Sequence, residues 1–160
     1  MRMLGQPLLL PANPVFIGAS LSVAFALGMV ETMGGWGAAV WAPDLLAVVL
    51  LFWSVYQPRR VGMGWGFALG LLIDVHQGSP MGLHALAYMA LCFFAVALNR
   101  RLMWFSLPQQ ALQVLPLFVI AHGIELTLRM VVGGSFPGWW VLLAPLLEAA
   151  IWPVAALVLL

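Results

Sequence analysis

The chain has 160 residues, of which 64% are hydrophobic and only 7% are charged, and its formal net charge is +1. A soluble domain carries about 25% charged residues, so this chain lacks the polar surface that a water-soluble fold needs. The small net charge gives no reason to expect nucleic-acid binding, and the apolar composition leaves no room for a separate soluble catalytic domain.

The apolar stretches predict an all-α integral membrane protein. A membrane-spanning helix needs about 20 residues, so a chain of this length holds six such helices joined by short connections. Glycine and proline clusters and charged residues divide the chain. The predicted spans are 14–33, 43–56, 61–75, 81–99, 109–132 and 139–160, which together form a single transmembrane domain over residues 1–160.

The arginines predict how the chain is oriented. Arg2 precedes the first span, Arg59 and Arg60 lie between the second and third, and Arg100 and Arg101 lie between the fourth and fifth. With six spans, all three places fall on one side of the membrane. The positive-inside rule assigns that side to the cytoplasm, so both the N- and the C-terminus are expected there.

The third span places an aspartate on a face of small residues. Gly62, Gly66, Gly70 and Asp74 follow one another at four-residue spacing, so they share one helix face to which a second backbone can come close. A carboxylate in a membrane needs a partner. We favour a structural role, in which Asp74 accepts hydrogen bonds from N–H groups of the turn 76–82 or of the next span. A contact with a ligand or a partner protein is the alternative.

Two further polar pairs lie near span ends. His84 and Tyr88 are four residues apart at the start of the fourth span, within reach of Asp74 across the turn. An Asp–His pair can act as a base, but no nucleophile with an oxyanion motif accompanies it, so no enzyme is expected. Pro43 and Asp44 open the second span, with proline at the first helical position and the aspartate complementing the helix dipole.

Glu125 and Arg129 are predicted to form an ion pair inside the membrane. The glutamate precedes the arginine by four residues, which is the favourable order on a helix. A proton or ion path is the alternative, but it would need a chain of acidic groups across the membrane. The chain has no group of His and Cys residues with metal-ligand spacing, so neither a metal nor another cofactor is expected.

An ordered set of residues between positions 42 and 117 carries a family resemblance. The set comprises Pro43-Asp44-Leu45-Leu46, Pro58, Gly66-Phe67, Gly70-Leu71-Leu72-Ile73-Asp74, Gly78, Gly82, His84-Ala85-Leu86-Ala87-Tyr88, Arg101, Phe105 and Gln109-Gln110. It resembles the rod shape-determining protein MreD family. The first and last spans fit that family in length and hydropathy only.

The resemblance implies a multi-pass protein of the bacterial inner membrane that belongs to the cell-elongation machinery. Members are implied to be scaffolds or regulators of lateral-wall peptidoglycan synthesis. The implied partners are MreC, the actin-like MreB, RodA, the elongation-specific penicillin-binding transpeptidase and membrane lipids. The six-span fold is implied to resemble the S subunits of energy-coupling-factor vitamin transporters. The alternative function is therefore a small-molecule-binding membrane subunit of a transporter.

Under this resemblance, the turn between the third and fourth spans is either a fixed corner of the fold or the lip of a cavity. Our hypothesis is that Asp74, Gly78, Gly82 and His84 shape that corner.

Overall fold

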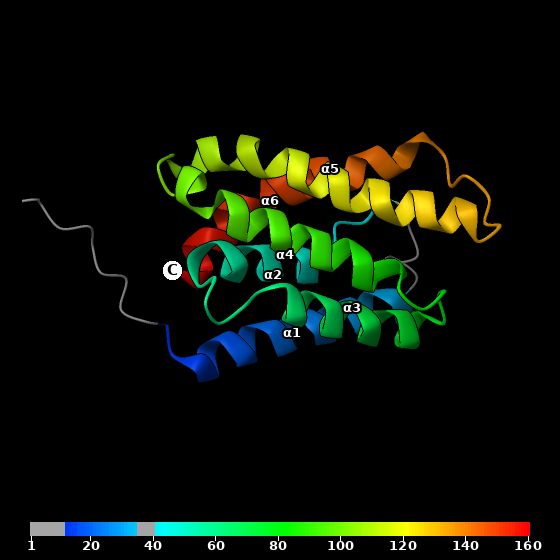
Figure 1. Ribbon diagram of the computed structural model, residues 1–160, viewed down its shortest axis with the longest axis horizontal. Helices are drawn as coiled ribbons and strands as arrows, with labels where there is room; N and C mark the ends of the chain where they lie inside the picture. Colours follow the sequence, from blue (N-terminus) through cyan, green and yellow to red (C-terminus); the bar gives the residue numbers. More distant parts are fainter. Residues whose placement is uncertain (1–11, 35–40) are drawn as a thin grey trace, which may run out of the picture.

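The computed structural model describes residues 12–34 and 41–160, and these residues form a bundle of α-helices (Figure 1). The helices are α1 (Pro14–Met33), α2 (Leu45–Tyr56), α3 (Met63–Gln77), α4 (Leu83–Leu102), α5 (Leu107–Val131) and α6 (Leu143–Leu159), with a short 3-10 helix, η1 (Trp139–Leu142), before α6. The all-α prediction is confirmed. Arg2 lies outside the described residues.

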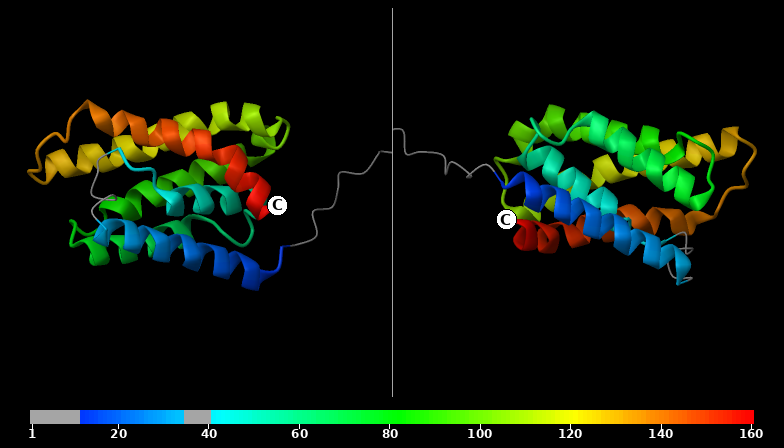
Figure 2. Two further views of the ribbon diagram at one scale, coloured as in Figure 1. Left: turned by 180° about the vertical axis from the view of Figure 1, so that it is seen from behind. Right: turned by 90° about the horizontal axis from the view of Figure 1, so that it is seen from below.

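Within residues 12–34 and 41–160, four helical segments are long and apolar enough to cross a membrane by length and composition: α1, α4, α5 and the continuous stretch of η1 and α6. The other two are shorter, with 12 residues in α2 and 15 in α3. All of them run along the long axis of the bundle. The beginning of α1 and the end of α6 therefore lie at the same end (Figures 1 and 2).

Capping residues shift two of the predicted helix starts. Asp44 is the N-cap of α2, and its side chain accepts a hydrogen bond from the Ala47 N–H at 3.1 Å. The helix thus begins at Leu45, and the prediction that Pro43 is its first residue was wrong because the aspartate caps instead. Ser106 and Gln109 form a capping box that starts α5 at Leu107, two residues earlier than expected.

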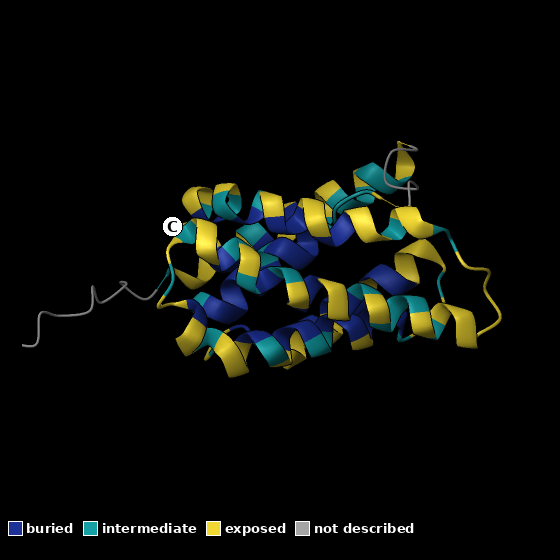
Figure 3. Cartoon of the chain, turned by 90° about the horizontal axis from the view of Figure 1, so that it is seen from above, coloured by how far each residue is buried: buried dark blue, intermediate teal, exposed yellow. Residues whose placement is uncertain are grey.

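The core surrounds α2, which lies in the middle of the bundle. Nine of its twelve residues are buried. Phe52 stacks on Tyr56 at a ring-centroid distance of 4.4 Å and also contacts Trp152 of α6. The outward faces of the surrounding helices are exposed, and many of the side chains there are large and apolar, which suits a lipid environment (Figure 3).

Two glycines of α3 let this helix lie directly against α4. An ideal Cβ at Gly66 would lie 2.7 Å from the Tyr88 carbonyl oxygen, and one at Gly70 would lie 2.6 Å from the Ala85 nitrogen. Real Cβ atoms do not come so close to a backbone, so both positions require glycine. The predicted face of small residues is confirmed at these two positions, whereas Gly62 is the N-cap of α3 and a Cβ there would make only an ordinary contact of 3.9 Å with the Pro58 carbonyl oxygen.

A polar cavity at one end of the bundle

A cavity of about 580 Å³ lies where α1, α3 and α5 end and where α2 and α4 begin. All three histidines of the chain line it, together with three of the five acidic residues. The other two, Asp74 and Glu148, contact lining histidines from behind. A chain with few polar side chains has therefore placed its carboxyl and imidazole groups around one space.

Asp74 is completely buried and accepts hydrogen bonds from several donors of the α3–α4 corner. Its Oδ1 atom accepts from Ser79 Oγ (3.0 Å), the His84 N–H (2.9 Å) and His84 Nδ1 (2.8 Å). Its Oδ2 atom accepts from the Gly82 N–H (2.8 Å) and the Ala85 N–H (3.4 Å). These contacts agree with the structural role expected for this carboxylate.

The same carboxylate caps α4, which has no capping side chain of its own. The N-cap residue of α4 is Gly82, and the backbone N–H groups at the start of that helix point at Asp74. Gly82 has a φ of 100° and Gly78, which ends α3, has a φ of 63°. Both values lie in the left-handed region that favours glycine. The four residues of the hypothesised corner thus lie together.

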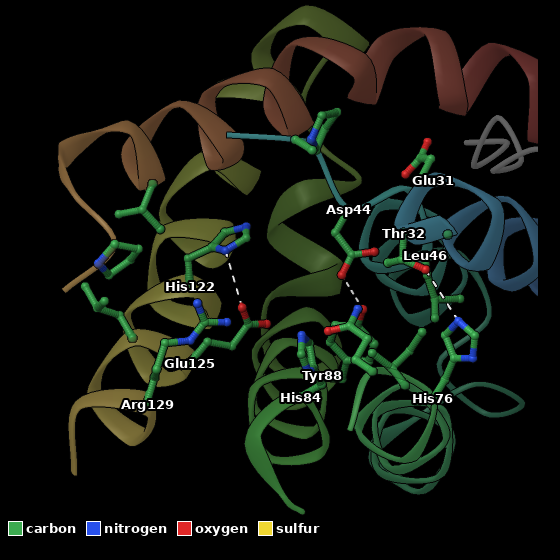
Figure 4. Close-up of a pocket in the computed structure, with 18 of the residues that line it drawn as sticks. Glu31, Thr32, Asp44, Leu46, His76, His84, Tyr88, His122, Glu125 and Arg129 are labelled. Carbon is green, nitrogen blue, oxygen red and sulfur yellow. Dashed lines mark hydrogen bonds and ion pairs between the residues drawn. The ribbon is translucent and has the colours of Figure 1, made fainter. Parts of the chain in front are cut away.

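Tyr88 points to a different partner from the one the sequence suggested. His84 contacts Asp74 as expected, but the Tyr88 hydroxyl donates a hydrogen bond to Asp44 Oδ2 at the start of α2. Asp44 therefore caps its own helix with one oxygen and binds α4 with the other. Asp44, Tyr88 and His84 all line the cavity (Figure 4).

Glu148 joins three helices behind the cavity wall. Its Oε1 atom accepts from the Asp44 N–H (2.9 Å) and contacts His122 Nε2 (2.9 Å). Its Oε2 atom is buried and has no hydrogen-bond partner among the described residues. Sequence reasoning did not find the partners of Glu148. The only signal was a lone carboxylate in an apolar span, which had to find a donor somewhere.

The expected ion pair between Glu125 and Arg129 is not formed. Glu125 Oε2 instead faces His122 Nδ1 at 3.6 Å, three residues away on the same helix, so His122 lies between two carboxyl groups. The stem of Arg129 packs against Gly134, where an ideal Cβ would lie 2.8 Å from Arg129 Cγ. That packing and the competing histidine explain why the spacing rule failed here.

Removing the Glu148 carboxyl group is expected to loosen the junction of α2, α5 and α6. Glu148→Leu leaves the Asp44 N–H and His122 Nε2 without their acceptor, at a cost of about 2–3 kcal/mol. Glu148→Gln keeps one acceptor oxygen and should cost less. Thermal unfolding in detergent, followed by circular dichroism, measures the order wild type, Gln, Leu. A leucine variant as stable as wild type would show that the junction contributes nothing.

The groups around the cavity include hydrogen-bond donors, hydrogen-bond acceptors and ionisable side chains. The Ser79 hydroxyl donates to Asp74 and is not activated by the His84 ring. Within residues 12–34 and 41–160, no three His, Cys, Asp or Glu side chains are placed to hold a metal ion. The cavity therefore offers hydrogen-bonding and charged groups of both signs to a polar molecule.

The apolar helices and the polar cavity at one end together define an all-helical membrane protein. Residues 12–159 match a family described as rod shape-determining protein MreD. The chain is also 31% identical over 136 residues to the rod shape-determining protein MreD of Haemophilus influenzae (strain ATCC 51907 / DSM 11121 / KW20 / Rd), with 81% of each chain covered. The chain belongs to the rod shape-determining protein MreD family, and its role lies in cell shape. No solved structure matches it.

Proposed function

We propose that the chain is a non-enzymatic scaffold or regulator of the bacterial cell-elongation machinery, supporting lateral-wall peptidoglycan synthesis. Its partners in this proposal are MreC first, and then MreB, RodA and the elongation-specific penicillin-binding transpeptidase. Membership of the MreD family and the role in cell shape support this proposal.

The observation that carries the proposal is the apolar exterior of the helices. Large apolar side chains are exposed on every long helix, and on α1 they include Val15, Val23, Leu27 and Val30. Side chains of this kind meet either lipid or other membrane helices. A protein built in this way contacts its partners through the lateral faces of its helices, as a membrane scaffold does.

We further propose that the six helices form one multi-pass domain in the inner membrane, with both termini in the cytoplasm. Arg59 and Arg60 lie between α2 and α3, and Arg100 and Arg101 end α4, so all four lie at the end opposite the cavity. The positive-inside rule supports placing that end in the cytoplasm. The cavity then opens on the outer side.

Affinity purification in mild detergent from native membranes, followed by mass spectrometry, tests the proposal. We expect MreC to be recovered in near-stoichiometric amount, with the wall synthases beside it. The tagged chain must first restore rod shape to cells depleted of the untagged protein. An unrelated, equally tagged multi-pass protein is the control for non-specific recovery. Recovery of ATPase subunits without MreC would instead indicate a transporter subunit.

A further inference from the structure

The cavity carries opposite charges on two separate walls. Figure 4 shows Arg129 on α5 at one side of the cavity and Glu31 near the end of α1 at the other. Asp44, at the start of α2, lies between these two walls in the same view. The walls come from helices far apart in the sequence, so helix packing alone decides their separation.

Arg129 provides a cation that no carboxyl group neutralises by direct contact. Its guanidinium forms neither an ion pair nor a hydrogen bond with the rest of the described chain. Its backbone carbonyl accepts from the Gly134 N–H at 2.9 Å, and the close passage of Gly134 holds its stem in place. Arg129 is exposed at the cavity, so its guanidinium is accessible to an anionic group of a ligand.

Glu31 provides an anion at a position that is unfavourable for the stability of its own helix. It lies in the last turn of α1, which ends at Met33, and a negative charge there opposes the helix dipole. The side chain is half-buried, yet it makes no hydrogen bond or ion pair with another described residue. A positively charged group that binds beside Glu31 would therefore gain a favourable contact.

We propose that the cavity binds a zwitterion, with its ammonium group between Glu31 and Asp44 and its phosphate or carboxylate at Arg129. Glu125 already faces His122, which leaves Glu31 and Asp44 as the lining carboxyl groups that can meet an ammonium group and Arg129 as the guanidinium that can meet an anion. A volume of about 580 Å³ lies within the range of pockets for small molecules. This proposal goes beyond the scaffold function and does not depend on it.

Two kinds of ligand carry the required ammonium and anionic groups. One is the headgroup of a lipid such as phosphatidylethanolamine, and the other is a free zwitterion of similar size. Both carry an ammonium group and an anionic group in one molecule, which is the pair of charges that the two walls can bind. The experiment must therefore use a soluble probe and a lipid probe.

Isothermal titration of the purified full chain with phosphoethanolamine tests the proposal directly. Ethanolamine and inorganic phosphate, which each carry one half of the charge pattern, are the comparison probes. Glu31→Gln and Arg129→Gln are each expected to weaken phosphoethanolamine binding by about tenfold or more, because each removes one charge-assisted contact. Arg101→Gln, at the opposite end of the bundle, is the matched control and should bind as wild type does.

The lipid probe uses nanodiscs that contain phosphatidylethanolamine together with phosphatidylglycerol, followed by purification and mass spectrometry of the retained lipid. Selective retention of phosphatidylethanolamine by wild type and Arg101→Gln, but not by the two cavity variants, identifies a headgroup even if the soluble probe fails to bind. Binding of the soluble probe alone identifies a free zwitterion. The proposal is overturned if neither probe binds, if ethanolamine or phosphate binds as tightly as phosphoethanolamine, or if either cavity variant binds as wild type does.

Discussion

Replacing Asp74 by leucine is expected to prevent the α3–α4 corner from forming. The carboxylate accepts from the N–H groups of Gly82 and His84, from the His84 ring and from the Ser79 hydroxyl, and it is fully buried. Leucine leaves all of these donors unpaired inside the protein. Each buried donor left without its acceptor costs about 1–3 kcal/mol, so the total is a large part of the stability of a small domain.

The loss should be visible as a lower midpoint of thermal unfolding in detergent and as a lower yield of monodisperse protein. Asp74→Asn keeps one acceptor oxygen but turns an NH₂ group toward the donors, so an intermediate loss is expected. Val75→Ala, beside Asp74 on the exposed face of α3 and outside the cavity, is the control and should be neutral. Cells that depend on the leucine variant are expected to lose rod shape. Normal stability and normal shape would refute the structural role of Asp74.

Gly70→Ala is expected to have the second large effect, although it adds only a methyl group. An ideal Cβ at this position would lie 2.6 Å from both the Ala85 nitrogen and the His84 carbonyl carbon. These are backbone atoms, so the contact can be relieved only if α3 and α4 move apart. Overpacking of this kind costs about 3 kcal/mol. Separation of the two helices would also lengthen the hydrogen bonds between Asp74 on α3 and its donors at the start of α4.

Gly64→Ala provides a control on the same helix. Its Cβ would meet no other atom within 4 Å, so stability should stay the same or rise slightly with the better helix propensity of alanine. Thermal unfolding of both variants under identical detergent conditions gives the comparison. Equal midpoints for Gly64→Ala and Gly70→Ala would mean that α3 and α4 are not in close backbone contact.

The parts of the fold that rest on local patterns could be predicted from the sequence. Hydropathy and turn residues predicted the helices, because an apolar run bounded by turn residues can be recognised without knowledge of tertiary contacts. The four-residue spacing of Gly66, Gly70 and Asp74 predicted a close helix contact with a buried acceptor at its end, because residues on one face must meet the same neighbour. Helix starts were less accurate, since capping by Asp44 and Ser106 decided them.

The parts of the site that rest on distant partners could not be predicted. The contact of Tyr88 with Asp44 spans 44 positions, and that of Glu148 with the Asp44 N–H spans 104. No spacing rule reaches so far, because the meeting of such residues depends on how whole helices pack. The error at Glu125 has the opposite origin. The four-residue spacing rule paired Glu125 with Arg129, but His122, three residues away on the same helix, is the partner that Glu125 faces.

The position of α1 has a consequence for how the protein responds to its neighbours. This helix packs mainly against α2, to which the hydrogen bond from Trp53 Nε1 to Ser20 Oγ ties it, and its end also contacts α3 through Thr32 and His76. It also carries Glu31, one charged wall of the cavity. Any neighbour in the membrane that shifts α1 changes the distance between the two walls. Thermodynamic reciprocity then requires that occupancy of the cavity alter the affinity for that neighbour by the same factor.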